Sequence, residues 1–262
     1  MLFVGIDLAW SPKNKSGIAV IKGDKEKGEL ICKDILCSDN DIVDYVTGEV
    51  NRKNALVAID APLTVPNREG RRVAEDITGM LFRKYNAGAY PANRTRLGQW
   101  SDGKIRGEEI VRLLEDTGFR HDPYIEKYEK TRNVFEVYPH PSMVVLFGLD
   151  RILRYKAKPK RDYEFRWNEF ERFQDYLKKL DGAKPSLALP EELTEKNVRR
   201  LRGNALKDYE DLLDSVFCAY IAYYGWVNPD RCAILGNTKD GYIFTPVSDA
   251  MKLQLSENKD QP

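Results

Sequence analysis

An acidic residue inside a strand-length apolar run is the feature that most constrains this chain. The run covers residues 2–10 (LFVGIDLAW) and contains Asp7. A carboxylate in a buried strand is costly unless a partner compensates its charge. A second apolar run at 55–63 (ALVAIDAPL) has the same feature, with Asp60 near its end. The pattern predicts two buried strands, each of which contributes an acid to a site that compensates it.

Two further acids lie far downstream, at the head of a helix predicted over 205–226. Asp211 and Asp214 are three residues apart, so they lie on the same side of that helix. The residues that follow on this side are small, as are the strand residues on the same side as Asp7 and Asp60. Small residues allow a helix to pack closely on a sheet, so we expect the acids to converge. The predicted metal ligands are Asp7, Asp60, Asp211 and Asp214.

The order of the apolar runs predicts an α/β fold. Three strands joined by short polar turns form an antiparallel meander, and a helix over 39–50 then leads to a fourth strand. A strand–helix–strand connection favours a fourth strand parallel to the first. The predicted strands of this five-stranded mixed sheet span 2–10, 17–22, 30–37, 55–63 and 134–138.

We expect a single domain over 1–262, in which helices flank the sheet. Residues 64–132 form a helical and loop insertion between the fourth and fifth strands. Residues 157–204 form a helical insertion before the last long helix. A short terminal strand or clasp is predicted over 241–247 (GYIFTPV).

Composition argues against several functional classes. The chain has 42 Lys and Arg against 41 Asp and Glu, so nucleic-acid binding would depend on local basic patches. Two histidines and no closely paired cysteines argue against a zinc site. No apolar run has the length of a membrane span and no signal segment precedes the first strand. We therefore expect a cytoplasmic protein with no membrane partner.

The converging acids predict a metal cofactor. Four carboxylates in one place repel one another unless divalent cations neutralise them, and Mg²⁺ (or Mn²⁺) favours oxygen ligands. Two such ions ~3.5–4 Å apart would support hydrolysis of a phosphate ester. Glu136, inside the fifth predicted strand, is a further candidate as metal ligand or general base. The alternative is that Glu136 faces solvent or pairs with an arginine of the insertion.

These motifs resemble the RNase H-like superfamily. Acids on the first and fourth strands and a D-x-x-D helix after the fifth are closest to Holliday-junction resolvases of the RuvC type. More closely, the chain resembles a family of predicted RNase H-like nucleases. The matching segments are GIDLAW, AIDAPL, REGRRVAE, EVYPHPS, RYKAKPKR, DLLDSVFCAYIA and GYIFTP.

The resemblance implies a nuclease whose first and fourth strands are neighbours in a mixed sheet. It implies Asp7, Asp60 and either Asp211 or Asp214 as metal ligands, with Glu136 also in the family pattern. One departure concerns the acid that RNase H has early in its first helix. This chain has no clear equivalent there, so the number of ligands per metal stays open.

Basic and aromatic residues predict contacts with a substrate. Arg94 and Arg96 lie in the loop 87–100 (AGAYPANRTRLGQW), where arginines could bind phosphate and aromatic residues could stack on bases. The alternative is a surface loop anchored by its aromatic side chains. Lys156, in the basic segment 151–161, could hold a phosphate backbone or lie on a solvated face. Arg72 is a further substrate-binding candidate, or it pairs with acids of its own helix.

Three functions are consistent with these patterns. The leading hypothesis is a metal-dependent nuclease that acts on DNA or RNA, with single-stranded or branched substrates favoured. The second is an actin-like or sugar-kinase-type phosphotransferase, but its glycine-rich phosphate turns have poor counterparts at 16–17 and 61–62. The third is a non-catalytic nucleic-acid-binding relative. The oligomeric state stays open.

Overall fold

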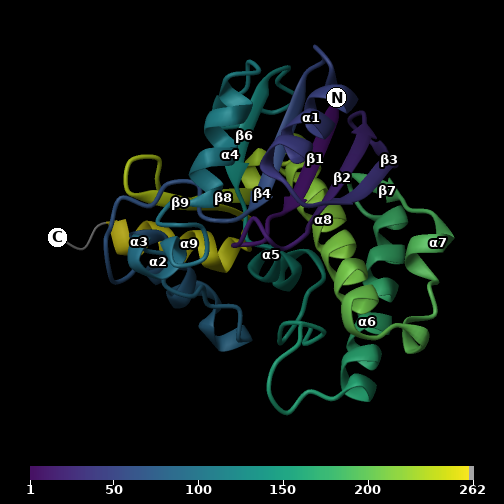
Figure 1. Cartoon of the computed structure of the whole chain (residues 1–262). Coiled ribbons are helices and arrows are strands. Elements are labelled where there is room, and N and C mark those ends of the chain that lie inside the picture. The colour runs from purple at the N-terminus through teal and green to yellow at the C-terminus, as the bar shows by residue number, and fades with distance from the viewer. Residues whose placement is uncertain (260–262) are drawn as a thin grey trace.

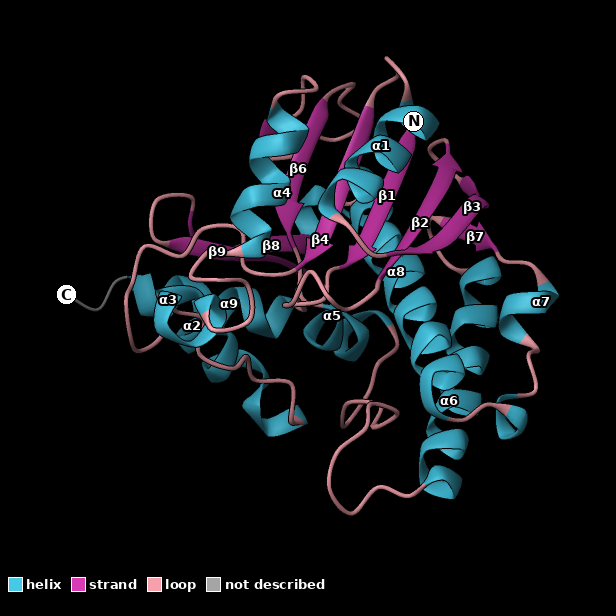
Figure 2. Cartoon of the chain, viewed as in Figure 1, coloured by secondary structure: helices cyan, strands magenta, loops and turns pink. Residues whose placement is uncertain are grey.

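The computed structural model describes residues 1–259 and shows a mixed α/β fold in which helices flank a seven-stranded central sheet (Figures 1 and 2). The strands of this sheet are β1 (Leu2–Asp7), β2 (Ser16–Gly23), β3 (Lys27–Leu36), β4 (Ala55–Asp60), β5 (Arg120–His121), β6 (Arg132–Glu136) and β7 (Ser186–Ala188). Their order is β5-β6-β4-β1-β2-β3-β7. The meander β1–β2–β3 is antiparallel, and all the other neighbours in this sheet pair in parallel.

We predicted five strands in the central sheet, but the sheet has seven. The additional strands β5 and β7 have only two and three residues and lie at opposite edges of the sheet. Such short strands show no alternation of apolar and polar residues, and tertiary pairing with β6 and β3 defines them. The predicted first and fourth strands were also too long. Both end at their acids, so Asp7 and Asp60 lie at the carboxyl edge of the sheet.

Helices cover both faces of the sheet (Figure 1). The longer ones follow the predicted apolar periodicity, and the short α3 and α7 lie in connecting segments. The α-helices are α1 (Asp39–Val50), α2 (Val73–Phe82), α3 (Arg94–Gly98), α4 (Arg106–Glu115), α5 (Pro139–Leu146), α6 (Tyr163–Lys178), α7 (Glu191–Thr194), α8 (Gly203–Val227) and α9 (Asp249–Lys259). Short 3₁₀ turns are η1 (Arg83–Tyr85), η2 (Lys179–Gly182), η3 (Val198–Arg200) and η4 (Pro229–Arg231).

The alternation of side chains along β1 divides the core into two layers. Val4 and Ile6 belong to the layer that α1 and α4 cover, whereas Phe3 belongs to the layer beneath α8. Successive strand residues point to opposite faces, so Asp7 lies on the same side as Phe3, toward α8. This parity brings the first acid to the helix that carries the other two.

A separate hairpin extends the fold beyond the sheet. It consists of β8 (Cys232–Asn237) and β9 (Gly241–Pro246), of which only β9 was predicted. A single parallel bridge between Val137 and Phe244 joins the hairpin to the end of β6. Among the described residues, no helix combines the length and apolarity that a membrane span requires.

Candidate functional site

Asp7 and Asp60 form the centre of the site. They are directly paired in register as the last residues of the parallel neighbours β1 and β4. Neighbouring strands lie ~4.8 Å apart, so the two carboxylates share the carboxyl edge of the sheet. In open α/β sheets this edge is where ligands commonly bind.

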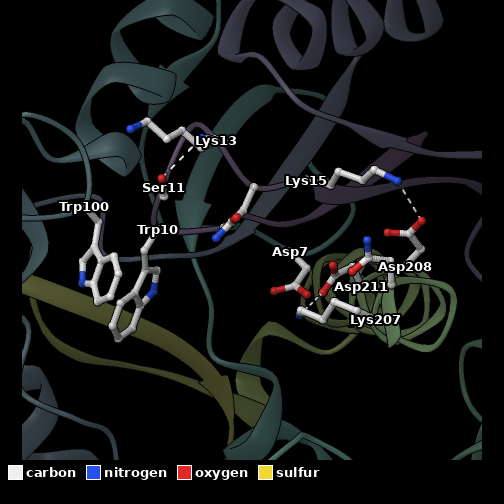
Figure 3. Close-up of a pocket in the computed structure, with 12 residues that line it drawn as sticks. Asp7, Trp10, Ser11, Lys13, Lys15, Trp100, Lys207, Asp208 and Asp211 are labelled. Atoms are coloured by element: carbon white, nitrogen blue, oxygen red, sulfur yellow. Dashed lines mark hydrogen bonds and ion pairs between the residues drawn. The ribbon is translucent and has the colours of Figure 1, made fainter. Parts of the chain in front are cut away.

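The helix α8 brings Asp211 to this edge because it packs against glycines. A Cβ atom added at Gly5 would lie 2.0 Å from the carbonyl oxygen of Ser215, and one at Gly17 would lie 2.0 Å from that of Asp211. Only glycine permits such an approach between a strand and a helix. The carboxyl groups of Asp211 and Asp7 are consequently in hydrogen-bonding contact, and their side chains converge in Figure 3.

Burial and mutual repulsion shift the ionisation of these acids. Burial, followed by the charge of Asp7, raises the pKa of Asp211 to about 9. Burial also raises the pKa of Asp60 well above its ordinary value, an effect that Lys156 opposes and Asp7 reinforces. At neutral pH Asp211 therefore retains a proton that a bound cation would displace.

Two lysines compensate the acids of α8 in different ways. The Lys156 ammonium lies 2.8 Å from Oδ2 of Asp214, whose side chain is fully buried, and the Tyr155 hydroxyl donates to Oδ1 at 2.5 Å. Lys207 pairs with Asp211 on the same helix and with Glu210 at 3.0 Å, but its own side chain is 56% exposed. Asp214 is thus held by a buried tyrosine and a half-buried lysine, whereas Asp211 pairs with a lysine that is mostly exposed.

Glu136 and Arg72 form a buried ion pair beside the central acids. The Arg72 guanidinium donates to both carboxylate oxygens of Glu136, at 2.9 and 2.6 Å, and to Glu75 at 2.8 Å. The backbone N–H of Leu63 donates to Glu136 at 2.8 Å. The structure thus places Glu136 in the alternative arrangement, paired with an arginine of the insertion. Arg72 has a side chain that is only 1% exposed, and its donors are engaged within the protein.

The two loop arginines lie in different surroundings. Arg94 is exposed and makes a bidentate ion pair with Glu108, at 3.0 and 2.8 Å. The Arg96 guanidinium instead stacks between two rings, 5.4 Å from the centroid of Trp10 and 5.3 Å from that of Tyr90. Of the predicted substrate-binding residues, Lys156 contacts the carboxylate of Asp214. Arg96 lies over the ring of Trp10, a residue that lines a cavity together with Asp7 and Asp211.

An open cavity of about 580 Å³ lies between the loop after β1 and the start of α8 (Figure 3). The carboxylates lie at one end of it and two tryptophans at the other. Its residues include Asp7, Trp10, Lys13, Lys15, Trp100, Asn204, Lys207, Asp208 and Asp211.

Several of these cavity residues were missed from the sequence. Trp10, Lys13 and Lys15 lie in or next to a polar turn, where no periodicity distinguishes a functional side chain from a solvated one, and Lys207 lies near the start of α8. The signal that could have identified the first three is the basic turn SPKNKSG, which closely follows an acid-bearing strand.

The donor set fits a magnesium ion that keeps part of its water shell. Within residues 1–259, no three His, Cys, Asp or Glu side chains are arranged to hold one ion. Asp7, however, contacts Asp211 and is paired in register with Asp60. Mg²⁺ is usually bound by one or two carboxylates together with waters and substrate phosphates, which these oxygen donors can provide.

The fold and the site define a mixed α/β protein with paired carboxylates at the carboxyl edge of its sheet. The family model described as "Protein of unknown function (DUF429)" matches residues 5–239, so the chain belongs to this family. The matched span includes Asp7, Asp60, Lys156, Asp211 and Asp214. No curated protein matches the chain.

Proposed function

We propose that this protein is a nuclease of the RNase H-like class, which hydrolyses phosphodiester bonds of nucleic acid with Mg²⁺ or Mn²⁺. The observation that supports the proposal best is the convergence of Asp7, Asp60 and Asp211, from three distant segments, beside an open cavity. Acids at three such positions carry a large electrostatic cost. A divalent cation is the partner that offsets this cost most directly.

The arrangement of the sheet also favours the RNase H-like assignment. The strands β3-β2-β1-β4-β6 are consecutive, with β1 and β4 as parallel neighbours, as the sequence resemblance implies. The helix with the D-x-x-D motif packs across β1 and presents Asp211 at the same edge. A phosphotransferase with glycine-rich phosphate turns has no comparable support.

Each residue of the site has a chemical role in this proposal. Asp7 together with Asp60 or Asp211 would hold the metal, which when bound would activate a water and polarise the phosphate. Lys156 neutralises Asp214 in the middle of α8. Lys207 presents its exposed ammonium to the cavity, where it can contact a phosphate oxygen.

The decisive test is a cleavage assay with Mg²⁺, Mn²⁺ or EDTA on single-stranded, duplex, hybrid and branched DNA and RNA. We expect metal-dependent cleavage that Asp7→Asn lowers at least ~100-fold, the upper end of the loss seen when even outer partners of a metal are removed. Asp44→Asn, on the exposed side of α1, is the matched control and should cleave normally. Cleavage unchanged by Asp7→Asn would refute the mechanism. ATP turnover without cleavage would favour the phosphotransferase.

A further inference from the structure

Two tryptophans are exposed in the cavity that contains the acids. Trp10 is 41% exposed and Trp100 is 51% exposed, whereas the other two tryptophans, Trp167 and Trp226, are 7% and 6% exposed. Both exposed indoles line the same cavity as Asp7, and Figure 3 shows them next to each other at the end opposite the carboxylates. Exposed indoles beside a polar site are typical of binding surfaces for planar ligands.

The segment that carries Trp10 is held in place by a buried arginine. Arg106, whose side chain is 3% exposed, donates to the carbonyl oxygens of Ala9 at 2.7 Å and Ser11 at 3.2 Å, on either side of Trp10. It also pairs with Asp39 at 2.7 Å. The indole of Trp10 is therefore presented by an ordered backbone, which reduces the entropic cost of stacking a ligand on it.

Cations lie near Trp10. Lys13 is exposed and lines the same cavity as Trp10 and Asp7, and the Arg96 guanidinium lies over the Trp10 ring, 5.4 Å from its centroid. In the described part of the chain the Arg96 side chain pairs with no carboxylate, so its N–H groups can reach a phosphate. Lys158 lies close by, 3.0 Å from the Tyr90 hydroxyl.

Trp10 also lines two cavities, each of which contains one acid of the sheet edge. It lines the large cavity together with Asp7, and it lines a smaller cavity of about 100 Å³ together with Asp60 and Tyr90. Aromatic side chains therefore line both cavities, Trp10 and Trp100 in the larger one and Trp10 and Tyr90 in the smaller one.

We propose that Trp10 and Trp100 form a stacking site for unpaired bases of a single-stranded nucleic acid, whose phosphates Lys13 and Arg96 contact. That the ligand is a nucleic acid rests on the nuclease proposal above. The faces of bases in a duplex are already stacked on one another, so only an unpaired strand can offer them to an indole. DNA and RNA share this chemistry, and separate measurements distinguish them.

Tryptophan fluorescence tests the site directly. In EDTA, which prevents metal-dependent cleavage, the protein is titrated with oligo(dT), oligo(rU) and a DNA duplex of equal length. We expect the single strands to quench the emission of the two exposed indoles, with the buried pair as constant background, and the duplex to bind at least tenfold more weakly. Whichever single strand binds more tightly identifies the preferred polymer. No quenching, or equal quenching by the duplex, would overturn the proposal.

Variants then assign the site. Trp10→Ala and Trp100→Ala should each weaken single-strand binding, measured by anisotropy of a labelled strand, by about 5- to 150-fold, the range for loss of one stacked base. Tyr124→Ala removes an aromatic ring that is 60% exposed outside both cavities and should bind as the wild type does. Circular dichroism checks that each variant folds. If Trp10→Ala does not fold, Trp100→Ala alone provides the test. Wild-type affinity in a folded tryptophan variant would contradict the stacking site.

The two proposals fail in different ways. Single-strand binding that depends on both tryptophans, without cleavage under any metal condition, would support the stacking site and refute the nuclease. Cleavage that depends on Asp7, with binding that is indifferent to the tryptophans, would overturn the stacking site and leave the nuclease in place.

Discussion

Asp211 and Asp214 differ in their partners, although they belong to one motif. Tyr155 and Lys156 hold Asp214 in a fully buried position. Asp211 contacts Asp7 instead, and its cationic partner Lys207 is exposed. Asp211 can therefore exchange its partner for a metal at little cost, whereas Asp214 cannot. Under the proposed mechanism Asp211 rather than Asp214 is therefore the metal ligand, a choice that the family resemblance left open.

This difference predicts opposite effects on stability. Burial and the charge of Asp7 raise the pKa of Asp211 to about 9, so folding at pH 7 must protonate this carboxyl, and Asp211→Asn should raise the free energy of unfolding by removing that cost. Asp214→Asn leaves the Lys156 ammonium without its carboxylate and should lower the free energy of unfolding by roughly 1–3 kcal/mol. Urea denaturation at pH 7 in EDTA measures both. Equal destabilisation by the two variants would contradict the assignment.

The lowered pKa of His140 predicts how the free energy of unfolding depends on pH. Burial, followed by the charge of Lys156, lowers the pKa of His140 from 6.5 to about 3. The folded protein keeps the ring neutral while the unfolded chain protonates it, so this contribution is complete above pH 6.5 and is lost as the pH falls toward 3. Between pH 7 and pH 5 the wild type should lose about 2 kcal/mol more than His140→Gln.

Urea denaturation of both proteins at the two pH values tests this expectation. The carboxylates titrate in both proteins, so the comparison isolates the imidazole. Equal losses in the wild type and in His140→Gln would show that the ring is protonated in the folded state as easily as in the unfolded chain.

At the scale of elements, apolar periodicity was sufficient to predict a helix or strand that buries one full face. It identified the meander, α1, β4, β6 and α8, and the acids within these apolar segments stood out for the same reason. The edge strands β5 and β7 depend on pairing partners far away in the sequence and show no pattern of their own. The same limit applies to Trp10, Lys207 and Arg106, whose roles follow from tertiary placement.

The contact between α8 and the sheet predicts an intolerant position at Gly5. A Cβ atom there would lie 2.0 Å from the Ser215 carbonyl oxygen and 2.2 Å from the Ala219 nitrogen, both of which are backbone atoms. Gly5→Ala must therefore move the helix, so we expect a loss of ~3 kcal/mol or more, at the upper end of overpacking costs. Thermal unfolding followed by circular dichroism measures the loss.

Gly48 provides the matched control for this substitution. It lies within α1, and a Cβ atom there would meet nothing within 4 Å. Gly48→Ala should therefore raise stability by up to ~1 kcal/mol through helix propensity alone. If Gly5→Ala proves as harmless as Gly48→Ala, the close packing of α8 that brings Asp211 to Asp7 is incorrect.

At the scale of the whole molecule, charge predicts how steeply the affinity for a nucleic acid falls with salt concentration. The net charge of +1 provides no long-range attraction for a polyanion, so phosphate contacts must come from cations near the two cavities. The four candidates are Lys13, Arg96, Lys158 and Lys207. Each neutralised phosphate of a single strand contributes about −0.7 to the slope of log K against log salt, so four contacts predict a slope near −3.

Fluorescence titration of oligo(dT) at several KCl concentrations in EDTA measures this slope. Lys13→Ala should make the slope about 0.7 less steep, because one phosphate contact is lost. Lys239→Ala, on the turn between β8 and β9, removes an exposed lysine away from both cavities and should leave the slope unchanged. A slope steeper than about −5 would require a broad basic surface, which the balanced charge of this chain does not provide, and the strand would then bind elsewhere than across Asp7 and Asp60.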